Sequence, residues 1–177
     1  MAKLICLDAG HGGCDYGAIN GSYKEKIANL GITLKVGVKL KEKGYDVVYT
    51  RVSDRDMTLQ ERCNVANNSK GDVFVSIHCN SATNKSAEGI ETFKYPTSKS
   101  KLAKCIQDAL VKNFPKEKNR GLKEDKFYVL KHTKMPAALV EVGFISHNET
   151  AKKLYSYSYQ EKLARVIVEG IEDFFGK

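Results

Sequence analysis

The sequence has no segment that could cross a membrane or direct secretion. No run approaches the roughly 20 apolar residues that a membrane span requires. The apolar run at the N-terminus ends at Asp8, which makes it too short for a signal peptide. We therefore expect synthesis in the cytoplasm without a signal peptide, and no insertion into the membrane.

The chain also lacks a cysteine framework. Its five cysteines form no CxxC pair, and an odd number in a chain of this size argues against a disulfide scaffold. The sequence has no internal repeat, low-complexity tract or linker. With 177 residues, of which 42% are hydrophobic, it can bury one sizeable core. We therefore expect a single globular domain.

The charge balance favours polyanionic partners. Lys and Arg number 29 against 21 Asp and Glu, which gives a net charge of +8. Nucleic acid, acidic lipid and an anionic cell wall would all be attracted by this charge, which does not choose among them. Many of the lysines lie in helix-like segments, where a solvated helix face is the simpler explanation.

Strand-like and helix-like patterns alternate along the chain. Apolar runs predict strands over 3–7, 46–51, 73–78, 89–95, 127–130 and 137–142. Helical spacing predicts helices over 25–43, 99–114 and 159–175, another begins at a Thr58–Glu61 capping box, and 115–126 is expected to be a loop. In the first helix, the residues that recur at the spacing of one face are Ile27, Leu30, Leu34 and Val38. This order predicts an α/β fold, with a mostly parallel twisted sheet of about six strands and helices on both faces.

Ionisable residues lie where the predicted strands end. The first strand leads to His11, the third ends at His78, and the last carries Glu141. Glu25 opens the first helix, from which its carboxylate can turn back to the same edge. In such sheets, ligands bind outside the carboxyl ends of the strands. Two imidazoles, one carboxylate and an open fourth position form a catalytic zinc site.

Each of these residues also has a simpler explanation. His11 lies between glycines and could bond to the backbone, while His78 could be a satisfied core histidine. Glu25 could favour the helix N-terminus electrostatically. Glu141 is more informative, because a carboxylate in an apolar run is costly to bury unless a cation, a donor or a metal-bound water is nearby.

Other sites fit the sequence less well. The glycine-rich loop that follows the first strand lacks the lysine of a phosphate-binding GxxxxGK[ST] loop and the GxGxxG spacing, and the HExxH zinc motif is absent. His132 and His147 are alternative ligands, but neither ends a buried strand. Cys79 is expected to point away from the side chain of His78, because neighbouring side chains alternate along a strand.

Five motifs together resemble a known family. They are LDAGHGG at 7–13, KEK at 24–26, TR at 50–51, SIHCN at 76–80 and LVEVGFIS at 139–146. Each motif is weak alone, but the five occur in order over nearly the whole chain. They are similar to the zinc-dependent N-acetylmuramoyl-L-alanine amidase family, the catalytic domains of bacterial autolysins and phage endolysins.

The resemblance implies a specific reaction. His11, Glu25 and His78 would bind one Zn²⁺ per chain, and Glu141 would be the catalytic base. The bond cleaved would be the amide between the lactyl group of N-acetylmuramic acid and L-alanine. The partner would then be peptidoglycan, reached after release or lysis, and not nucleic acid. Arg62 and Asn67 are expected to be structural.

Some features depart from the family or leave alternatives open. An asparagine commonly follows EVGFIS, whereas this chain has His147 there and Asn148 one residue later. Wall-binding repeats are missing, so we expect a catalytic domain over 1–177. We expect substrate contacts from loops at 80–88 and 115–126, whose lysines could meet anionic wall polymers. A zinc carboxy- or aminopeptidase of similar architecture and a non-catalytic wall- or nucleic-acid-binding domain are the alternatives, and the sequence does not indicate an oligomeric state.

Overall fold

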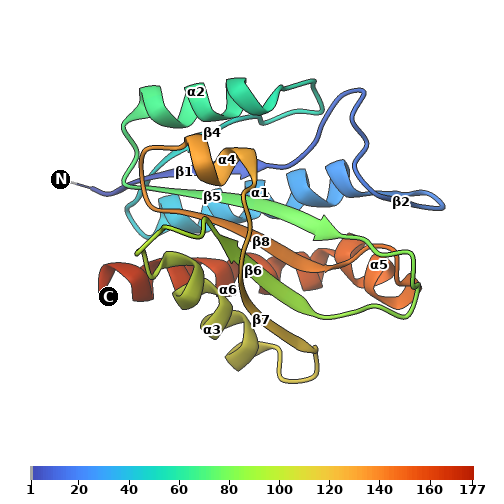
Figure 1. Cartoon of the computed structure of the whole chain (residues 1–177). Coiled ribbons are helices and arrows are strands. Elements are labelled where there is room, and N and C mark those ends of the chain that lie inside the picture. The colour runs from blue at the N-terminus through green and yellow to red at the C-terminus, as the bar shows by residue number, and fades with distance from the viewer. Residues whose placement is uncertain (1) are drawn as a thin grey trace.

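A computed structural model describes residues 2–177 and has one six-stranded sheet at its centre (Figure 1). Across the sheet, the strands are β4 (Asp46–Tyr49), β1 (Leu4–Ala9), β5 (Val73–Asn80), β8 (Ala137–Phe144), β6 (Ile90–Lys94) and β7 (Asn119–Glu124). All neighbouring strands are parallel except β6 and β8, which are antiparallel. The predicted mostly parallel sheet is confirmed.

Helices cover both faces of the sheet, as predicted. One face carries α1 (Glu25–Glu42), α3 (Leu102–Asn113) and α6 (Tyr157–Phe175), which pack around the larger core. The other face carries α2 (Leu59–Ser69) and the short α4 (Tyr128–His132), which enclose a smaller core. β1 lies between the two layers and is almost entirely buried, which explains its continuous apolar run.

The capping box at the start of α2 is also confirmed. The Thr58 hydroxyl accepts a hydrogen bond from the Glu61 backbone N–H, and the Glu61 carboxylate accepts one from the Thr58 backbone N–H. These reciprocal bonds satisfy two backbone donors that a helix N-terminus would otherwise leave unpaired. They fix where α2 begins beside the glycine-rich loop.

The face predicted for α1 is wrong. Ile27 is 41% exposed and Val38 is 53% exposed. The face that meets the core carries Ala28, Asn29, Ile32, Thr33, Val36, Gly37 and Leu40. It includes polar residues that form hydrogen bonds within the fold: the Thr33 hydroxyl donates to the Asn29 carbonyl, and the Asn29 amide donates to the Gly10 carbonyl. The Asn29 side-chain oxygen has no partner among residues 2–177. Because the buried face of α1 contains polar residues, a prediction based on apolar residues alone selected the outer face.

Two predictions near residue 120 are also wrong. Residues 115–126 were expected to form a loop, but Asn119–Glu124 is the edge strand β7, which pairs only with β6. A charged sequence suits an exposed sheet edge. Residues 127–130 were expected to form a strand, but Tyr128–His132 is the helix α4. A short apolar run does not distinguish a strand from a short helix.

The structure adds elements that the sequence patterns did not predict. A small hairpin of β2 (Ile19–Asn20) and β3 (Tyr23–Lys24) leads into α1, and α5 (Asn148–Tyr155) precedes α6. The helix predicted over 159–175 is confirmed as α6, and its inner face carries Leu163 and Ile167, which are fully buried. Within residues 2–177, none of the helices combines the length and the apolar character needed to span a membrane.

Candidate active site

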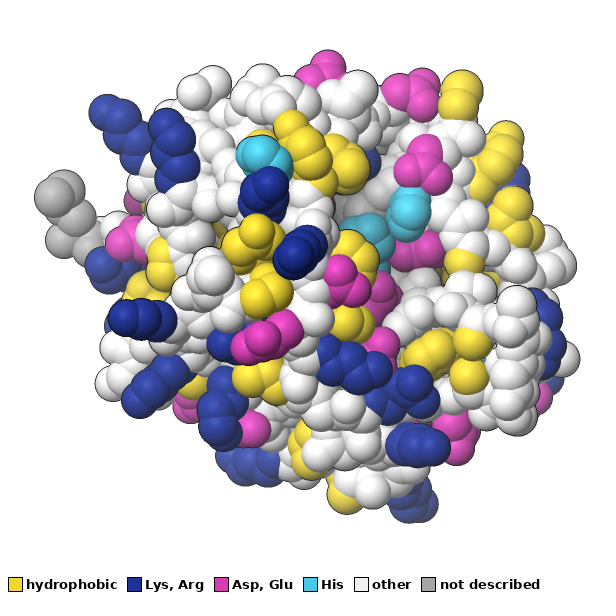
Figure 2. All heavy atoms as spheres, in the orientation of Figure 1, with side chains coloured by type: hydrophobic (Ala, Val, Ile, Leu, Met, Phe, Trp, Pro, Cys, Tyr) yellow, Lys and Arg dark blue, Asp and Glu magenta, His cyan; other side chains and the backbone are white. Residues whose placement is uncertain are grey.

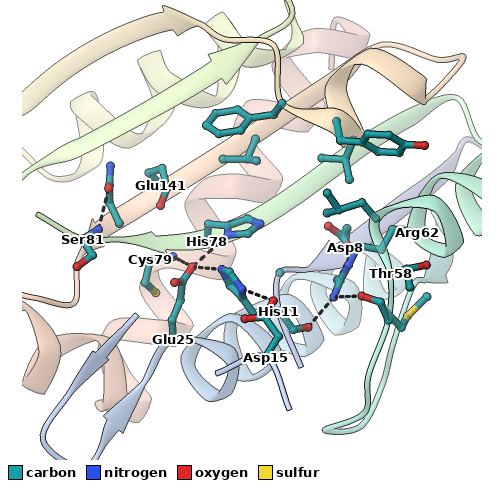
Figure 3. Close-up of a pocket in the computed structure, with 18 residues that line it drawn as sticks. Asp8, His11, Asp15, Glu25, Thr58, Arg62, His78, Cys79, Ser81 and Glu141 are labelled. Carbon is teal, nitrogen blue, oxygen red and sulfur yellow. Dashed lines mark hydrogen bonds and ion pairs between the residues drawn. The ribbon is translucent and has the colours of Figure 1, made fainter. Parts of the chain in front are cut away.

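The predicted site residues meet at the carboxyl edge of the sheet (Figure 3). His11 follows β1, His78 lies near the end of β5, and Glu141 lies on the neighbouring strand β8. Glu25 is the first residue of α1, and the hairpin before it returns the chain to this edge. Parallel strands end on the same side of a sheet, so residues far apart in sequence come together here.

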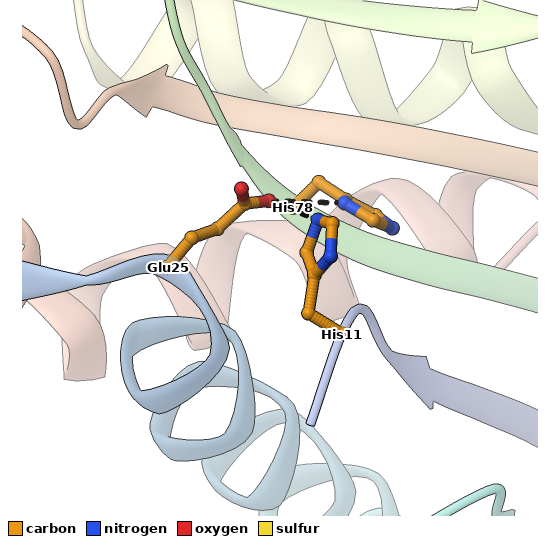
Figure 4. A group of neighbouring side chains, drawn as sticks. All are labelled: His11, Glu25 and His78. Carbon is orange, nitrogen blue, oxygen red and sulfur yellow. Dashed lines mark hydrogen bonds and ion pairs between the residues drawn. The ribbon is translucent and has the colours of Figure 1, made fainter. Parts of the chain in front are cut away.

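His11, Glu25 and His78 form a compact cluster of donor atoms (Figure 4). One donor atom from each residue lies within 4.8 Å of the others. Glu25 Oε1 is 3.2 Å from His11 Nε2 and 3.0 Å from His78 Nδ1. Two imidazole nitrogens and a carboxylate oxygen can therefore face one divalent cation, which is the donor set of a catalytic metal centre with an open position.

Glu25 is held as a charged carboxylate. Its Oε2 accepts the Ala18 backbone N–H at 2.9 Å, and its Oε1 accepts the Cys79 backbone N–H at 3.1 Å. Burial would raise the pKa of Glu25, but the hydrogen bonds and charges of the two histidines outweigh it and hold the pKa far below its usual range. A deprotonated carboxylate is the form that binds a metal.

Asp15 orients the His11 ring. Its carboxylate lies 2.7 Å from His11 Nδ1, which leaves Nε2 directed toward Glu25. Burial alone would lower the pKa of His11, but the bonds and charges of Glu25 and Asp15 raise it overall. A carboxylate on the second nitrogen of a metal-binding histidine fixes the tautomer and increases the basicity of the ligand. Sequence reasoning missed this role, although Asp15 lies only four residues after His11.

A buried ion pair supports the His11 loop from beneath. Arg62 donates to the Asp8 carboxylate at 2.8 Å and to the carbonyl oxygens of Ala9 and His11, each at 2.7 Å. Thr50 and Ser76 also donate to Asp8, each at 2.6 Å. Burial would raise the pKa of Asp8, but Arg62 and the two hydroxyls lower it overall.

The structural roles expected for Arg62 and Asn67 are thus consistent with their contacts. Asn67 joins α2 to the segment that follows α4, since its amide donates to the His132 carbonyl and accepts from the Lys134 N–H.

Glu141 faces the cluster from the adjacent strand. It is the register partner of His78 in the parallel β5–β8 pair, so both side chains project from the same side of the sheet. Its Oε2 atom is buried and has no hydrogen-bond partner among residues 2–177. Burial, and then the negative charges of Glu25 and Glu91, raise the pKa of Glu141 well above its ordinary value. A raised pKa makes the Glu141 carboxylate a stronger base, so Glu141 is suited to accepting a proton and passing it on.

The alternative ligands lie elsewhere. His132 is exposed and stacks on Tyr128, while His147 is the N-cap residue of α5 and contacts the Thr150 hydroxyl. Cys79 is buried in the larger core and is not one of the three clustered donors. Asn148, which stands one residue after the usual family position, accepts a bond from the Asn20 amide at 2.9 Å and so ties the β2–β3 hairpin to α5.

The cluster opens into a cavity of about 550 Å³. One wall is apolar and is formed by Met57, Leu59, Phe127, Val129 and Leu139, which the sequence had not indicated. Of the loop at 80–88, Asn80 and Ser81 line the cavity, whereas none of residues 115–126 does. An apolar wall next to a metal-ligand set and an unpaired carboxyl group can bind a partly apolar substrate and hydrolyse it.

Known proteins resemble this chain in sequence, and a solved structure resembles it in fold. Protein YqiI of Bacillus subtilis is 42% identical over 98% of this chain and 85% of its own length. The N-acetylmuramoyl-L-alanine amidase LytC of Bacillus subtilis is 38% identical over 99% of this chain, which spans only 36% of LytC. The catalytic domain of the amidase CwlV from Bacillus (Paenibacillus) polymyxa superposes with a TM-score of 0.94 at 34% identity, covering 98% of both chains.

The family comparison agrees with these relatives. The N-acetylmuramoyl-L-alanine amidase family matches residues 5–173, which include His11, Glu25, His78 and Glu141. Its match extends over all six strands of the sheet except the first residue of β1. With this match, and with a sheet that ends in a cluster suited to a metal, the chain belongs to the N-acetylmuramoyl-L-alanine amidase family and is a peptidoglycan hydrolase.

Proposed function

We propose that the chain hydrolyses the amide bond between the lactyl group of N-acetylmuramic acid and L-alanine with the help of one Zn²⁺. His11, Glu25 and His78 hold the ion, and Glu141 transfers the proton. The observation that carries this proposal is the convergence of three donor atoms within 4.8 Å, beside a carboxyl oxygen that is buried without a partner.

The donor set fits zinc better than magnesium or calcium. Zn²⁺ accepts imidazole nitrogen together with carboxylate oxygen, whereas Mg²⁺ and Ca²⁺ prefer sites made entirely of oxygen. The Asp15 carboxylate on His11 Nδ1 is the kind of outer support that zinc-binding histidines have. When bound, the ion supplies a Lewis acid that polarises the substrate carbonyl and acidifies water.

Glu141 carries the proton through the reaction. A water molecule attacks the lactyl carbonyl carbon while Glu141 accepts one of its protons. Glu141 then gives this proton to the nitrogen of L-alanine as the C–N bond breaks, leaving a lactyl carboxylic acid and a free amine. The unpaired Oε2 is free to make both transfers, because no residue within 2–177 occupies it with a hydrogen bond.

Purified peptidoglycan provides the direct test. The protein, stripped of metal and then reloaded with zinc, should clear a wall suspension and release new L-alanine amino termini without new reducing sugar ends. Chelator should stop the reaction and zinc should restore it. Reducing sugar ends would indicate a glycosidase, and free amino acids from soluble peptides with an intact wall would indicate a peptidase. Either result would overturn the proposal.

A further inference from the structure

A buried carboxylate beside the active site holds two cations on the edge strand. The Glu91 side chain on β6 is only 4% exposed. Its Oε2 accepts from Arg120 Nε at 2.7 Å and from Lys123 Nζ at 2.6 Å, and both cations belong to β7. Its Oε1 accepts from the Asn80 amide at 2.7 Å. One buried anion therefore fixes the positions of two positively charged side chains.

This group lies next to the catalytic cavity. Glu91 is the register partner of Glu141 across the β6–β8 pair, and Asn80 lines the cavity. In Figure 2, acidic side chains lie just below the cyan histidines of the hollow, and a group of Lys and Arg side chains lies immediately below them. Glu91, to which both cations are bonded, therefore lies one strand away from Glu141, on the side of the cavity where β7 forms the sheet edge.

The two cations keep donors that the protein does not use. One carboxylate faces two positive charges, so the group has an excess charge of one. Among residues 2–177, Lys123 donates one of its three N–H groups, to Glu91. Arg120 donates Nε to Glu91 and makes a long bond from Nη1 to the Glu88 carbonyl at 3.5 Å, which leaves its Nη2 group without a partner among residues 2–177. Its guanidinium also lies over the Phe144 ring at 4.8 Å, which restricts its motion. Partly exposed, oriented donors with an excess positive charge suit an anionic ligand.

The distance from Glu141 to the two cations on β7 suits a substrate peptide with an acidic group one residue beyond L-alanine. Neighbouring strands are about 4.8 Å apart, so β7 lies roughly 10 Å from β8, which carries Glu141. An extended peptide advances about 3.3–3.6 Å per residue, and a long basic side chain covers the remaining distance. Stem peptides carry carboxylates near this point, and some walls amidate them.

We propose that Arg120 and Lys123 form a subsite for a stem-peptide carboxylate, and that Glu91 positions both cations. The inference rests on the proposed function, because it needs the scissile amide to lie at His11, His78 and Glu141. It places the peptide along the β7 side of the cavity. The enzyme would then distinguish a wall with a free carboxylate from one in which that group is a carboxamide.

Two synthetic muramoyl dipeptides test this subsite. They differ only in whether the α-carboxyl group of the second residue is free or amidated. The zinc-loaded protein should cleave the carboxylate form with a kcat/KM about tenfold or more above that of the amide, mainly through KM, because hydrogen bonds to charged groups are strong. The triple variant E91Q/R120Q/K123Q should lose this preference without leaving a buried charge unpaired.

Two further variants distinguish the effect of the charges at Arg120 and Lys123 from the effect of the protein's net charge. R120K/K123R keeps both charges and should retain much of the preference. K41Q/K43Q also removes two positive charges, but at the opposite end of α1 from Glu25, about 27 Å away for a helix of 18 residues, and should retain all of it. Loss of the preference in K41Q/K43Q would overturn the proposal.

Binding without metal gives a second readout. The dipeptide product with a free carboxylate should bind the metal-free protein, measured by NMR titration, more tightly than its amidated form, and added salt should weaken binding. R120Q and K123Q should each reduce this difference in affinity. These single variants test the subsite even if the triple variant does not fold. Equal cleavage and equal binding of the two forms would reject the subsite and leave the proposed function intact, whereas cleavage of neither form would reject the proposed function itself.

Discussion

At the residue scale, Gly10 allows His78 to take its place in the metal cluster. A Cβ atom at Gly10 would lie 2.2 Å from both Cε1 and Nε2 of the His78 ring. Real atoms do not approach this closely, so either the ring or the loop would have to move. We expect Gly10→Ala to weaken zinc binding at least tenfold. A displaced histidine should reduce the affinity for zinc at least as much as the loss of a residue that holds a metal ligand in position. Competition with a chromogenic chelator measures this.

A matched glycine provides the control. At Gly71, a new Cβ would lie no closer than 3.4 Å to its neighbours, which is ordinary contact. Gly71→Ala should therefore bind zinc as the parent does. Equal zinc affinity in Gly10→Ala and the parent would show that the His78 position does not depend on this close approach.

Glu141 separates metal binding from proton transfer. Glu141→Gln keeps the size of the side chain but removes the group that accepts a proton. We expect normal zinc content and a loss of kcat of about 10²–10⁴-fold, the usual contribution of a general acid–base group. Elemental analysis and a wall-clearing assay measure the two quantities. Full activity in this variant would remove Glu141 from the mechanism.

At the scale of elements, Arg62 joins α2 to β1 and the His11 loop. The folded pKa of Asp8 is below its unfolded value, so the ionised carboxylate stabilises the fold above about pH 4, and this contribution is lost as the pH falls. Arg62→Met removes the cation, which should raise the folded pKa of Asp8 and cost about 3–5 kcal/mol of stability, as expected for breaking a buried pair.

The acid-unfolding midpoint of Arg62→Met should therefore move to higher pH. Circular dichroism over a pH series measures this shift. Arg165→Met removes a charge from the exposed side of α6 and should leave the midpoint almost unchanged. An unaltered midpoint in Arg62→Met would mean that Asp8 does not depend on this ion pair.

The sequence predicted the elements whose conformation follows from the pattern of their own residues. β1, β5 and β8 are buried on both faces, so their continuous apolar runs were unambiguous, and His11, His78 and Glu141 could be placed at their ends. β7 could not be predicted, because its residues are charged and its strand conformation comes from pairing with β6. Likewise, the role of Asp15 and the contact of Glu91 with β7 depend on loop geometry and strand order, which no local pattern encodes.

At the scale of the whole molecule, one ion would join three separate elements. The ligands come from the loop after β1, the start of α1 and the end of β5. A ligand that binds only the folded state stabilises it by about 2.7 kcal/mol at 100 times its Kd. Zinc should therefore raise the Tm of the parent and chelator should lower it.

The same melting experiment on His78→Ala tests where the ion binds. This variant lacks one of the three donors, so zinc should raise its Tm much less. An equal rise in both proteins would place the stabilising ion elsewhere on the surface, where the many charged side chains offer weaker sites. Metal content measured in parallel distinguishes weak binding from none.

The pairing of His78 with Glu141 has a genetic consequence. Their separation is set by main-chain bonds between β5 and β8, so changes of length in the turn at 81–89 leave it intact. One codon inserted between Ala137 and Glu141 would instead turn Glu141 to the opposite face of the sheet. Such an insertion would abolish turnover while every ligand residue remained, and a second insertion nearby could restore it.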